Sequence, residues 1–383
     1  MQDPSTMVEN TDFSPEEITE EESGISQFQL MKRQFLRNKL AVAGLIVISI
    51  CFIVYVFFPG FFAVNRYTSI QEDYMFAAPQ VPQFFDEEGN FHIRPFTYGL
   101  ESELNMETLT WEYSLDMSEK HSIYFINRDH ENDYKLLGFI PTNIRLMGIE
   151  SSDPWYPFGA DRMGRCVYSR ILHGGRISLT VGLVGVILTV LLGTVLGTIS
   201  GYFGGLVDTM IQRLIELLLS FPAIPLWAAL AAAVPPEWTS VQTFFMISII
   251  LSLRNWVGLG RQIRGKVMSY REEEYTLAAE SAGASGFYIV RKHMIPNALS
   301  HVIVVATLSI PGMILAETAL SFLGLGIQPP MVSWGTLLQT AQRVDVVLSH
   351  QWLMIPGFAV VVAVLAYNFL GDGIRDAADP FST

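Results

Sequence analysis

Few residues in this sequence could carry covalent or metal chemistry, and their spacing does not suit it. The segment Gly260–Lys266 has the glycine and lysine spacing of a phosphate-binding P-loop. However, Val267 stands where that motif places the serine or threonine that holds Mg²⁺, and a predicted membrane helix precedes it instead of a strand. Cys51 and Cys166 lie far apart and lack metal-ligand spacing. We therefore predict no catalytic residue, no metal site and no cofactor bound by this chain.

Four charged residues fall inside long apolar runs, where ionisable groups are candidate functional sites by default. Arg213 and Glu216 are three residues apart and can pair along one helix face, which favours a structural role. Arg254 can extend its side chain toward the nearer membrane surface. Glu317 lies beside small residues, so a hydrogen bond between helices is as good an interpretation as a place in a pore.

Two prolines, Pro222 and Pro225, fall inside the third apolar run. In a continuous helix each would remove a hydrogen bond and bend the axis. A kink tolerated by the packing and a hinge that lines a translocation path are both open interpretations.

The elements that position these residues are long apolar helices. The chain has 383 residues, of which 50% are hydrophobic and only 16% are charged, too apolar a composition for ordinary soluble domains. About 20 apolar residues cross the hydrocarbon core of a bilayer. The sequence predicts an all-α polytopic membrane protein with six spans, near residues 40–58, 177–200, 211–233, 241–260, 302–323 and 353–370.

The distribution of lysine and arginine predicts the orientation of these spans, because short cytoplasmic loops are rich in both residues. With both termini in the cytoplasm, the short outer loops 234–240 and 324–352 hold only Arg343. The inner segments then hold Lys32, Arg33, Arg37, Lys39, Arg261, Arg264, Lys266, Arg271, Arg291, Lys292 and Arg375. We predict a multi-pass protein of a bacterial or archaeal cell membrane.

The formal net charge of −13 comes from two segments outside the predicted spans. Residues 1–23 have eight acidic and no basic residues, which predicts a disordered tail over 1–30. An anchor helix over 31–59 follows, with a cleaved signal peptide as the less favoured interpretation. Residues 60–160 have sixteen acidic and six basic residues and predict a β-rich or mixed extracytoplasmic insertion. Residues 161–383 form the transmembrane domain, and no basic face suggests nucleic-acid binding.

A polar segment between the fourth and fifth predicted spans is the strongest indication of function. Residues 271–282 are strong helix formers, and Gly283 can end that helix in a left-handed turn. Ser285 can cap a second short helix, which should stop by Pro296. An amphipathic hairpin on the membrane surface is possible, but its glutamates favour a protein partner.

The pattern Ala278-Ala279, then Gly283, then Ile295-Pro296-Asn297 resembles the cytoplasmic coupling loop of ABC importer permeases, here within 265–297. The resemblance implies a loop that docks into an ATPase subunit. Leu277 stands where the family often has glutamate, and Glu274 or Glu280 could supply that charge. The residues it implies for coupling are Glu274, Tyr275, Ala278, Ala279, Glu280, Gly283, Ala284, His293 and Pro296.

Other stretches are similar to the oligopeptide and dipeptide permeases, specifically their C-type subunit. They are Phe158–Arg165, Gly175–Leu179, the run Glu317–Gly326 and Trp334-Gly335, with Cys166 where the subfamily usually has aspartate. The resemblance implies the type I ABC importer fold and half of a peptide pore, in which Glu317 could meet a peptide's amino terminus. The partners implied are a second permease, two ATPase subunits that bind ATP and Mg²⁺, and an extracytoplasmic substrate-binding protein, besides the lipid bilayer.

The basic segment around Arg162, Arg165, Arg170 and Arg176 is predicted to be an outer amphipathic helix that contacts lipid headgroups or the binding protein. Nickel chelates or another small solute could replace peptide, since sister families share these motifs. A secondary transporter is less favoured, because it would need inverted repeats and would leave the polar cytoplasmic segment unexplained. A membrane-anchored sensor would not require six spans.

Overall fold

The computed structural model describes residues 27–106, 110–128, 134–149 and 154–378. Five helical stretches in this part of the chain are long and apolar enough to cross a membrane: Lys39–Phe57, Val167–Phe203, Ser240–Tyr270, Gly286–Phe322 and Gln351–Ala378. A bent pair of helices, α5 (Gly205–Ser220) and α6 (Ala223–Ala232), makes a sixth span if the two are counted together. The prediction of a mainly helical polytopic fold is confirmed.

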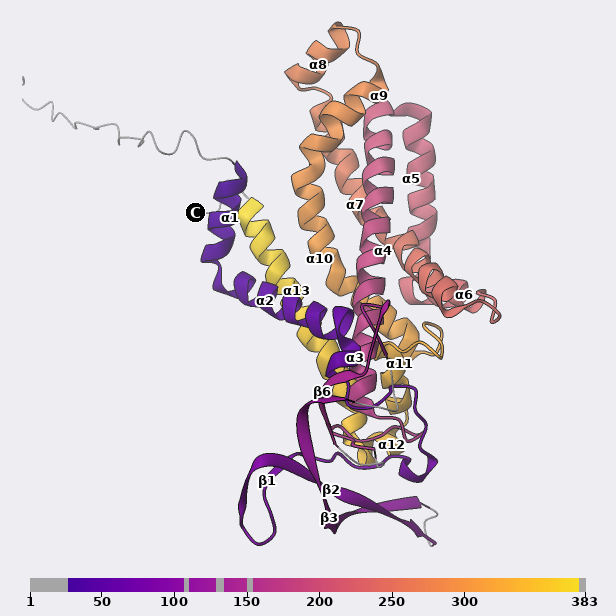
Figure 1. Ribbon diagram of the computed structural model, residues 1–383. Helices are drawn as coiled ribbons and strands as arrows, with labels where there is room; N and C mark the ends of the chain where they lie inside the picture. The colour runs from indigo at the N-terminus through magenta and orange to yellow at the C-terminus, as the bar shows by residue number, and fades with distance from the viewer. Residues whose placement is uncertain (1–26, 107–109, 129–133, 150–153, 379–383) are drawn as a thin grey trace, which may run out of the picture.

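Helices α4 (Val167–Phe203), α7 (Ser240–Tyr270) and α10 (Ile295–Phe322) pack side by side and form the centre of the bundle (Figure 1). Glycines on α4 let its backbone approach α7 closely. A Cβ atom added at Gly197 would lie 2.5 Å from the carbonyl oxygen of Gly260, and one at Gly201 would lie 2.7 Å from that of Arg264. Any larger residue at these positions would force the two helices apart.

The two ends of the bundle carry different structures. Helices α8 (Glu274–Ser281) and α9 (Gly286–Ile289) lie at one end, here called the α8 end, and the β-sheet lies at the opposite sheet end (Figure 1). Helices α11 (Trp334–Gln339) and α12 (Val344–Ser349) also lie toward the sheet end. These positions place the predicted coupling loop and the predicted outer insertion at opposite ends of the molecule.

The N-terminal helices pack against the C-terminal one. Helix α1 (Gln27–Arg37) begins inside the predicted tail, so residues 27–30 are helical, while residues 1–26 lie outside the described part. The predicted anchor over 31–59 is divided at Asn38, whose side chain accepts a hydrogen bond from the Ala41 amide and caps α2 (Lys39–Cys51). A π-helical turn, η2 (Phe52–Phe57), and the short α3 (Pro59–Phe62) follow, and α2 packs against α13 (Ile355–Ala378).

The third span is a broken helix rather than a kinked one. Its two halves, α5 and α6, meet at 90°. Pro222 is the N-cap of α6 and Pro225 lies in its first turn, where backbone N–H groups have no intrahelical partner. The prediction that each proline removes a hydrogen bond within a continuous helix is therefore wrong. Proline disfavours the helical conformation in the residue before it, and Phe221 is accordingly extended.

The insertion contains a four-stranded antiparallel sheet in the order β1-β2-β3-β6 and a separate β4-β5 pair. The strands are β1 (Gln83–Phe85), β2 (Phe91–Asn105), β3 (Thr110–Arg128), β4 (Tyr134–Leu136), β5 (Ile140–Thr142) and β6 (Ile144–Ile149). Residues 86–90 join β1 to β2. Residues 123–128 of β3 pair with β6, whereas residues 134–136 pair with β5.

Buried polar contacts fix the sheet to the segments that follow α3 and precede α4. The guanidinium of Arg145, which is only 4% exposed, donates to the carbonyl oxygen of Ala63 over 3.0 Å. Gln80 donates to the carbonyl of Tyr98 and accepts from the amide of Tyr156. Because these groups are buried, breaking any one of them would leave an unsatisfied polar atom, and the insertion is held against the bundle.

Candidate functional site

The segment at the α8 end is a pair of short helices joined by a tight turn. Helix α8 ends at Ser281, and Gly283 adopts the predicted left-handed conformation with φ of +81°. The amide of Ala284 then donates to the carbonyl of Ala279 over 3.0 Å. The side chain of Ser285 accepts from the Tyr288 amide and caps α9 as predicted.

The prediction that the second helix stops at Pro296 is wrong. Helix α9 continues through a π-helical turn, η4 (Val290–Met294), into α10, and Pro296 lies in the first turn of α10. The Ile295 amide bonds to the carbonyl of Val290, five residues back. This wider turn changes the hydrogen-bond register where the proline occurs, so the chain remains helical.

Four contacts hold this segment together and against the ends of α4 and α7. The hydroxyl of Tyr202, near the end of α4, donates to Glu280 over 3.2 Å, and the guanidinium of Arg271 lies 5.8 Å from the centre of the same ring. Thr276 is fully buried, and its hydroxyl donates to the carbonyl of Tyr270 over 2.7 Å. The ring of Tyr275 lies 5.9 Å from that of His293. These contacts join α8 to the ends of α4 and α7.

The outer surface of this segment is exposed and combines apolar with acidic side chains. Leu277 is 50% exposed and Phe287 is 72% exposed. Of the residues predicted for coupling, those on this exposed surface are Glu274, Tyr275, Ala278, Glu280 and Gly283, while Ala279 and Ala284 pack against the core cluster that contains Ile289. The result is a protrusion with an outward face that no other part of the described chain covers.

The α8 end also holds an ion pair that the sequence analysis missed. Both guanidinium contacts from Arg264 on α7 to Asp208 on α5 measure 2.6 Å, and the Ser200 hydroxyl donates to the same carboxylate. The two charged residues are 56 positions apart. No local pattern links residues at that separation, so only the packing of α5 against α4 and α7 reveals the pair.

The other charged residues within the spans have different environments. Arg213 and Glu216 form the predicted pair, with 2.8 Å between Nη1 and Oε2, and both side chains are largely exposed. Arg254 lies partly buried in the middle of α7, and its Nε has no hydrogen-bond partner in the described residues. These contacts do not bring Arg254 together with the pair on α5.

Glu317 is completely buried near the sheet end of α10. Its two oxygens accept hydrogen bonds from Ser178 on α4 over 2.9 Å and from Ser321 over 2.7 Å. Each serine in turn accepts from a backbone amide, that of Trp334 over 3.1 Å and that of Ile327 over 3.1 Å. Since an amide can only donate, each serine hydrogen must point to Glu317. The geometry is that of a hydrogen bond between helices.

This network, which we call the Glu317 clamp, fixes both ends of the loop 323–333. Glycines complete the close fit: a Cβ atom at Gly335 would lie 2.6 Å from the carbonyl oxygen of Thr318, and one at Gly326 would collide with Ser321. The indole of Trp334 donates to the carbonyl of Ile171 on α4. The packing of this loop on α4 and α10 therefore explains both the run Glu317–Gly326 and the pair Trp334-Gly335.

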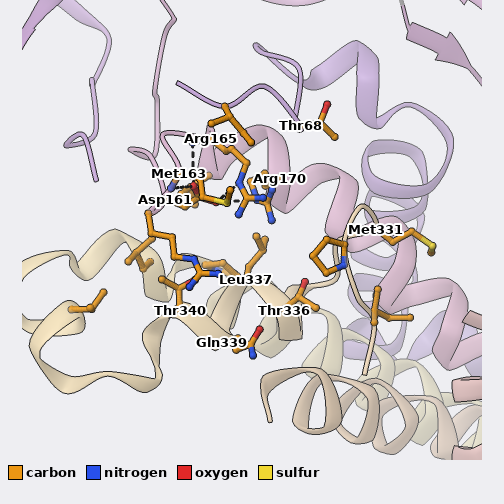
Figure 2. Close-up of a pocket in the computed structure, with 18 of the residues that line it drawn as sticks. Thr68, Asp161, Met163, Arg165, Arg170, Met331, Thr336, Leu337, Gln339 and Thr340 are labelled. Atoms are coloured by element: carbon orange, nitrogen blue, oxygen red, sulfur yellow. Dashed lines mark hydrogen bonds and ion pairs between the residues drawn. The ribbon is translucent and has the colours of Figure 1, made fainter. Parts of the chain in front are cut away.

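A cleft of about 1040 Å³ opens at the sheet end, between the segment before α4 and the loop held by the Glu317 clamp. Arg165 and Arg170 lie on one side of it and Thr336 and Thr340 on the other (Figure 2). Asp161 accepts from Arg165 Nε over 2.8 Å, and its Oδ2 lies 3.4 Å from Arg170 Nε.

The basic residues of this cleft do not form the predicted amphipathic helix. Residues 162 and 165 precede α4, which begins at Val167, and Arg165 and Arg170 turn inward to Asp161. Cys166 is 2% exposed, and burial raises the pKa of its thiol. It packs in an apolar cluster with Trp155 and Tyr156 and is the N-cap residue of α4.

Comparisons with known proteins agree with this architecture. The family described as binding-protein-dependent transport system inner membrane component matches residues 193–382, and the N-terminal transmembrane domain of oligopeptide transport permease C matches residues 26–79. The oligopeptide transport system permease protein OppC of Haemophilus influenzae is 33% identical over 359 residues, which cover 93% of this chain and 89% of that protein.

Two further relatives match a shorter part of this chain. The dipeptide transport system permease protein DppC of Bacillus subtilis is 39% identical over 60% of this chain and 69% of its own length. OppC of Salmonella typhimurium is 41% identical over 58% of this chain and 72% of its own length. Both the helical core and the N-terminal span are thus accounted for, and this multi-pass inner membrane protein belongs to the OppC/DppC family of ABC transporter permeases, as a C-type subunit.

Proposed function

We propose that this chain forms half of the pore of an ATP-driven importer of short peptides, together with a second homologous permease. Two ATPase subunits supply the ATP and Mg²⁺, and one of them receives the segment 265–297. The α8 end then faces the cytoplasm, with both termini on that side, and the sheet end faces outward. An extracytoplasmic binding protein delivers peptide at the sheet end.

The exposed surface of the α8–α9 segment is the single observation that carries this proposal. Leu277, Phe287 and three consecutive glutamates from Glu272 point away from the chain. Such a surface suits a protein groove better than an anionic membrane surface, which would repel the glutamates. The contacts through Tyr202 and Thr276 make it stiff, so movement of the ATPases would tilt α4 and α7 rather than bend the segment.

The mechanism that follows is alternating access. When ATP binding closes the two ATPases, the docked segments of the two permeases approach each other. Packed helices switch between discrete arrangements rather than deforming smoothly, so the two permeases rock toward an outward-open state. The cleft at the sheet end and the acidic insertion beside it are then positioned to meet the binding protein.

Reconstituted vesicles that contain this chain, the second permease and the ATPases test the proposal. Uptake of labelled di- and tetrapeptides should require ATP, the binding protein and hydrolysis-competent ATPases. Uptake without ATP would indicate a secondary transporter, and ATP-driven uptake of nickel chelates in place of peptide would correct the substrate while leaving the coupling intact.

The broken third span gives one specific prediction for this transport cycle. Replacing Pro222 by alanine frees Phe221 to become helical and allows α5 and α6 to join into one helix, so we expect uptake to fall at least fivefold while the complex still assembles. Pro225→Ala is the matched control, because the proline lies in a first turn and its loss should leave uptake near wild type. Normal uptake by Pro222→Ala would remove the hinge interpretation.

A further inference from the structure

Four polar residues form a stripe along one face of α5. Thr209, Arg213, Glu216 and Ser220 are spaced by four, three and four residues, which places them on one side of a helix. All four are exposed, with the Arg213 and Glu216 side chains 74% and 53% accessible. The opposite face of α5, formed by Ile211, Ile215 and Leu218, packs against Trp256 and Val257 on α7.

The stripe lies at membrane depth. Helix α5 begins at Gly205, two residues after the end of α4 beside the α8 segment. At a rise of 1.5 Å per residue, Arg213 is about 12 Å and Glu216 about 17 Å from that start, within a hydrocarbon core of about 30 Å. Charged groups at this depth face the interior of a bundle or a water-filled cavity rather than lipid.

The break after Ser220 also indicates that this part of α5 faces a cavity or protein rather than lipid. The last carbonyl groups of α5 have no helical partner beyond it, and Pro222 has no N–H group to offer them. Phe221, at the break, is 49% exposed in this chain. Irregular backbone at membrane depth occurs where it is buried in protein or lines a cavity, and broken helices with free backbone groups form solute sites in other transporters.

We propose that this stripe lines the water-filled translocation path, where Glu216 meets the ammonium end and Arg213 the carboxylate end of a passing peptide. The inference rests on the proposed function. A zwitterionic solute can exchange this exposed ion pair, closed at 2.8 Å, for two new ones, one at each of its charged ends. Exposed apolar residues beside the stripe, such as Met210 and Leu214, are suited to contact the second permease or lipid. The stripe then lies at the interface between the two permeases.

Thiol labelling of the assembled transporter tests whether the stripe is accessible to water. Cys51 and Cys166 are both buried, so the native background is low. Ser220→Cys should react with a charged, membrane-impermeant thiosulfonate at least tenfold faster than Leu219→Cys, which is a control at nearly the same depth about 100° around the helix. Equal slow rates would place the stripe against lipid. A disulfide that forms under an added oxidant between Ser220→Cys and a cysteine placed in the second permease would make the stripe a dry interface, and either result overturns the proposal.

Solute chemistry provides the second test. In vesicles, Glu216→Gln should reduce the preference for a dipeptide with a free amino terminus over its N-acetylated form at least threefold, while Glu237→Gln in the exposed loop after α6 should not. An unchanged preference would refute the contact with the ammonium end. If both the variant and wild type show ATP-driven uptake with the same preference, the proposed function stands and only the stripe assignment fails.

Discussion

Replacing Gly283 by arginine should abolish ATP-driven uptake, with at least a tenfold loss, and should prevent co-purification of the ATPase. Gly283 has φ of +81°, and a non-glycine residue in this conformation is strained by about 1–2 kcal/mol. No heavy atom lies within 4 Å of a Cβ atom built there, so the arginine side chain would project outward from the surface proposed to dock. The loss should therefore come from blocked docking rather than misfolding.

Two controls separate blocked docking from strain. Gly283→Asn keeps a residue that tolerates the left-handed conformation and adds little bulk, so it should retain most uptake. Gly89→Arg makes the same change at a glycine with φ of +82° and equally open surroundings, but at the sheet end. It should leave ATPase binding unchanged. Normal ATPase binding by Gly283→Arg would contradict the assignment of this surface.

Replacing Glu317 by leucine should give the largest loss of stability of any single change in the transmembrane domain. The leucine fills a similar volume but leaves the hydroxyl groups of Ser178 and Ser321 without acceptors. An unsatisfied buried polar group costs about 1–3 kcal/mol, so two of them should cost roughly 2–6 kcal/mol. The thermal unfolding midpoint in detergent, followed by tryptophan fluorescence, should fall clearly.

Partial variants of the Glu317 clamp sharpen this prediction. Glu317→Gln keeps one acceptor oxygen and should lose about half as much stability, while Glu237→Gln, in an exposed loop, should lose almost none. Combining Glu317→Leu with Ser178→Ala should cost less than the sum of the single changes, because the two residues share a hydrogen bond. Strict additivity, or an unchanged midpoint in Glu317→Leu, would show that the network does not hold the loop.

Local features of this molecule could be predicted from sequence because their causes are local. Hydropathy located the spans, and the spacing of Arg213 and Glu216 predicted their ion pair. Gly283 predicted the turn that ends α8, because such a turn requires only a residue in the left-handed conformation shortly after the helix. Each of these depends on residues within a few positions of one another.

The features that sequence analysis missed depend on contacts between distant segments. Asp208 meets Arg264 across 56 residues, and Ser178 meets Glu317 across 139. The strand partner of residues 123–128 is β6 rather than the nearer segment at 134. Pro296 was expected to end a helix, but a π-helical turn just before it keeps the chain helical, and nothing in the residue types announces that turn.

The most direct test of the central claim is a cross-linking experiment at the exposed face of α8. A cysteine placed at Ala278, beside the partly exposed Leu277, should cross-link to a cysteine in the groove of the ATPase subunit in the assembled transporter, with a yield that changes between nucleotide-free and ATP-bound states. The same substitution at Gly89 should give no cross-link to the ATPase. If position 278 touches no ATPase subunit in any nucleotide state, this segment is not the coupling element and the account of how this permease is driven fails.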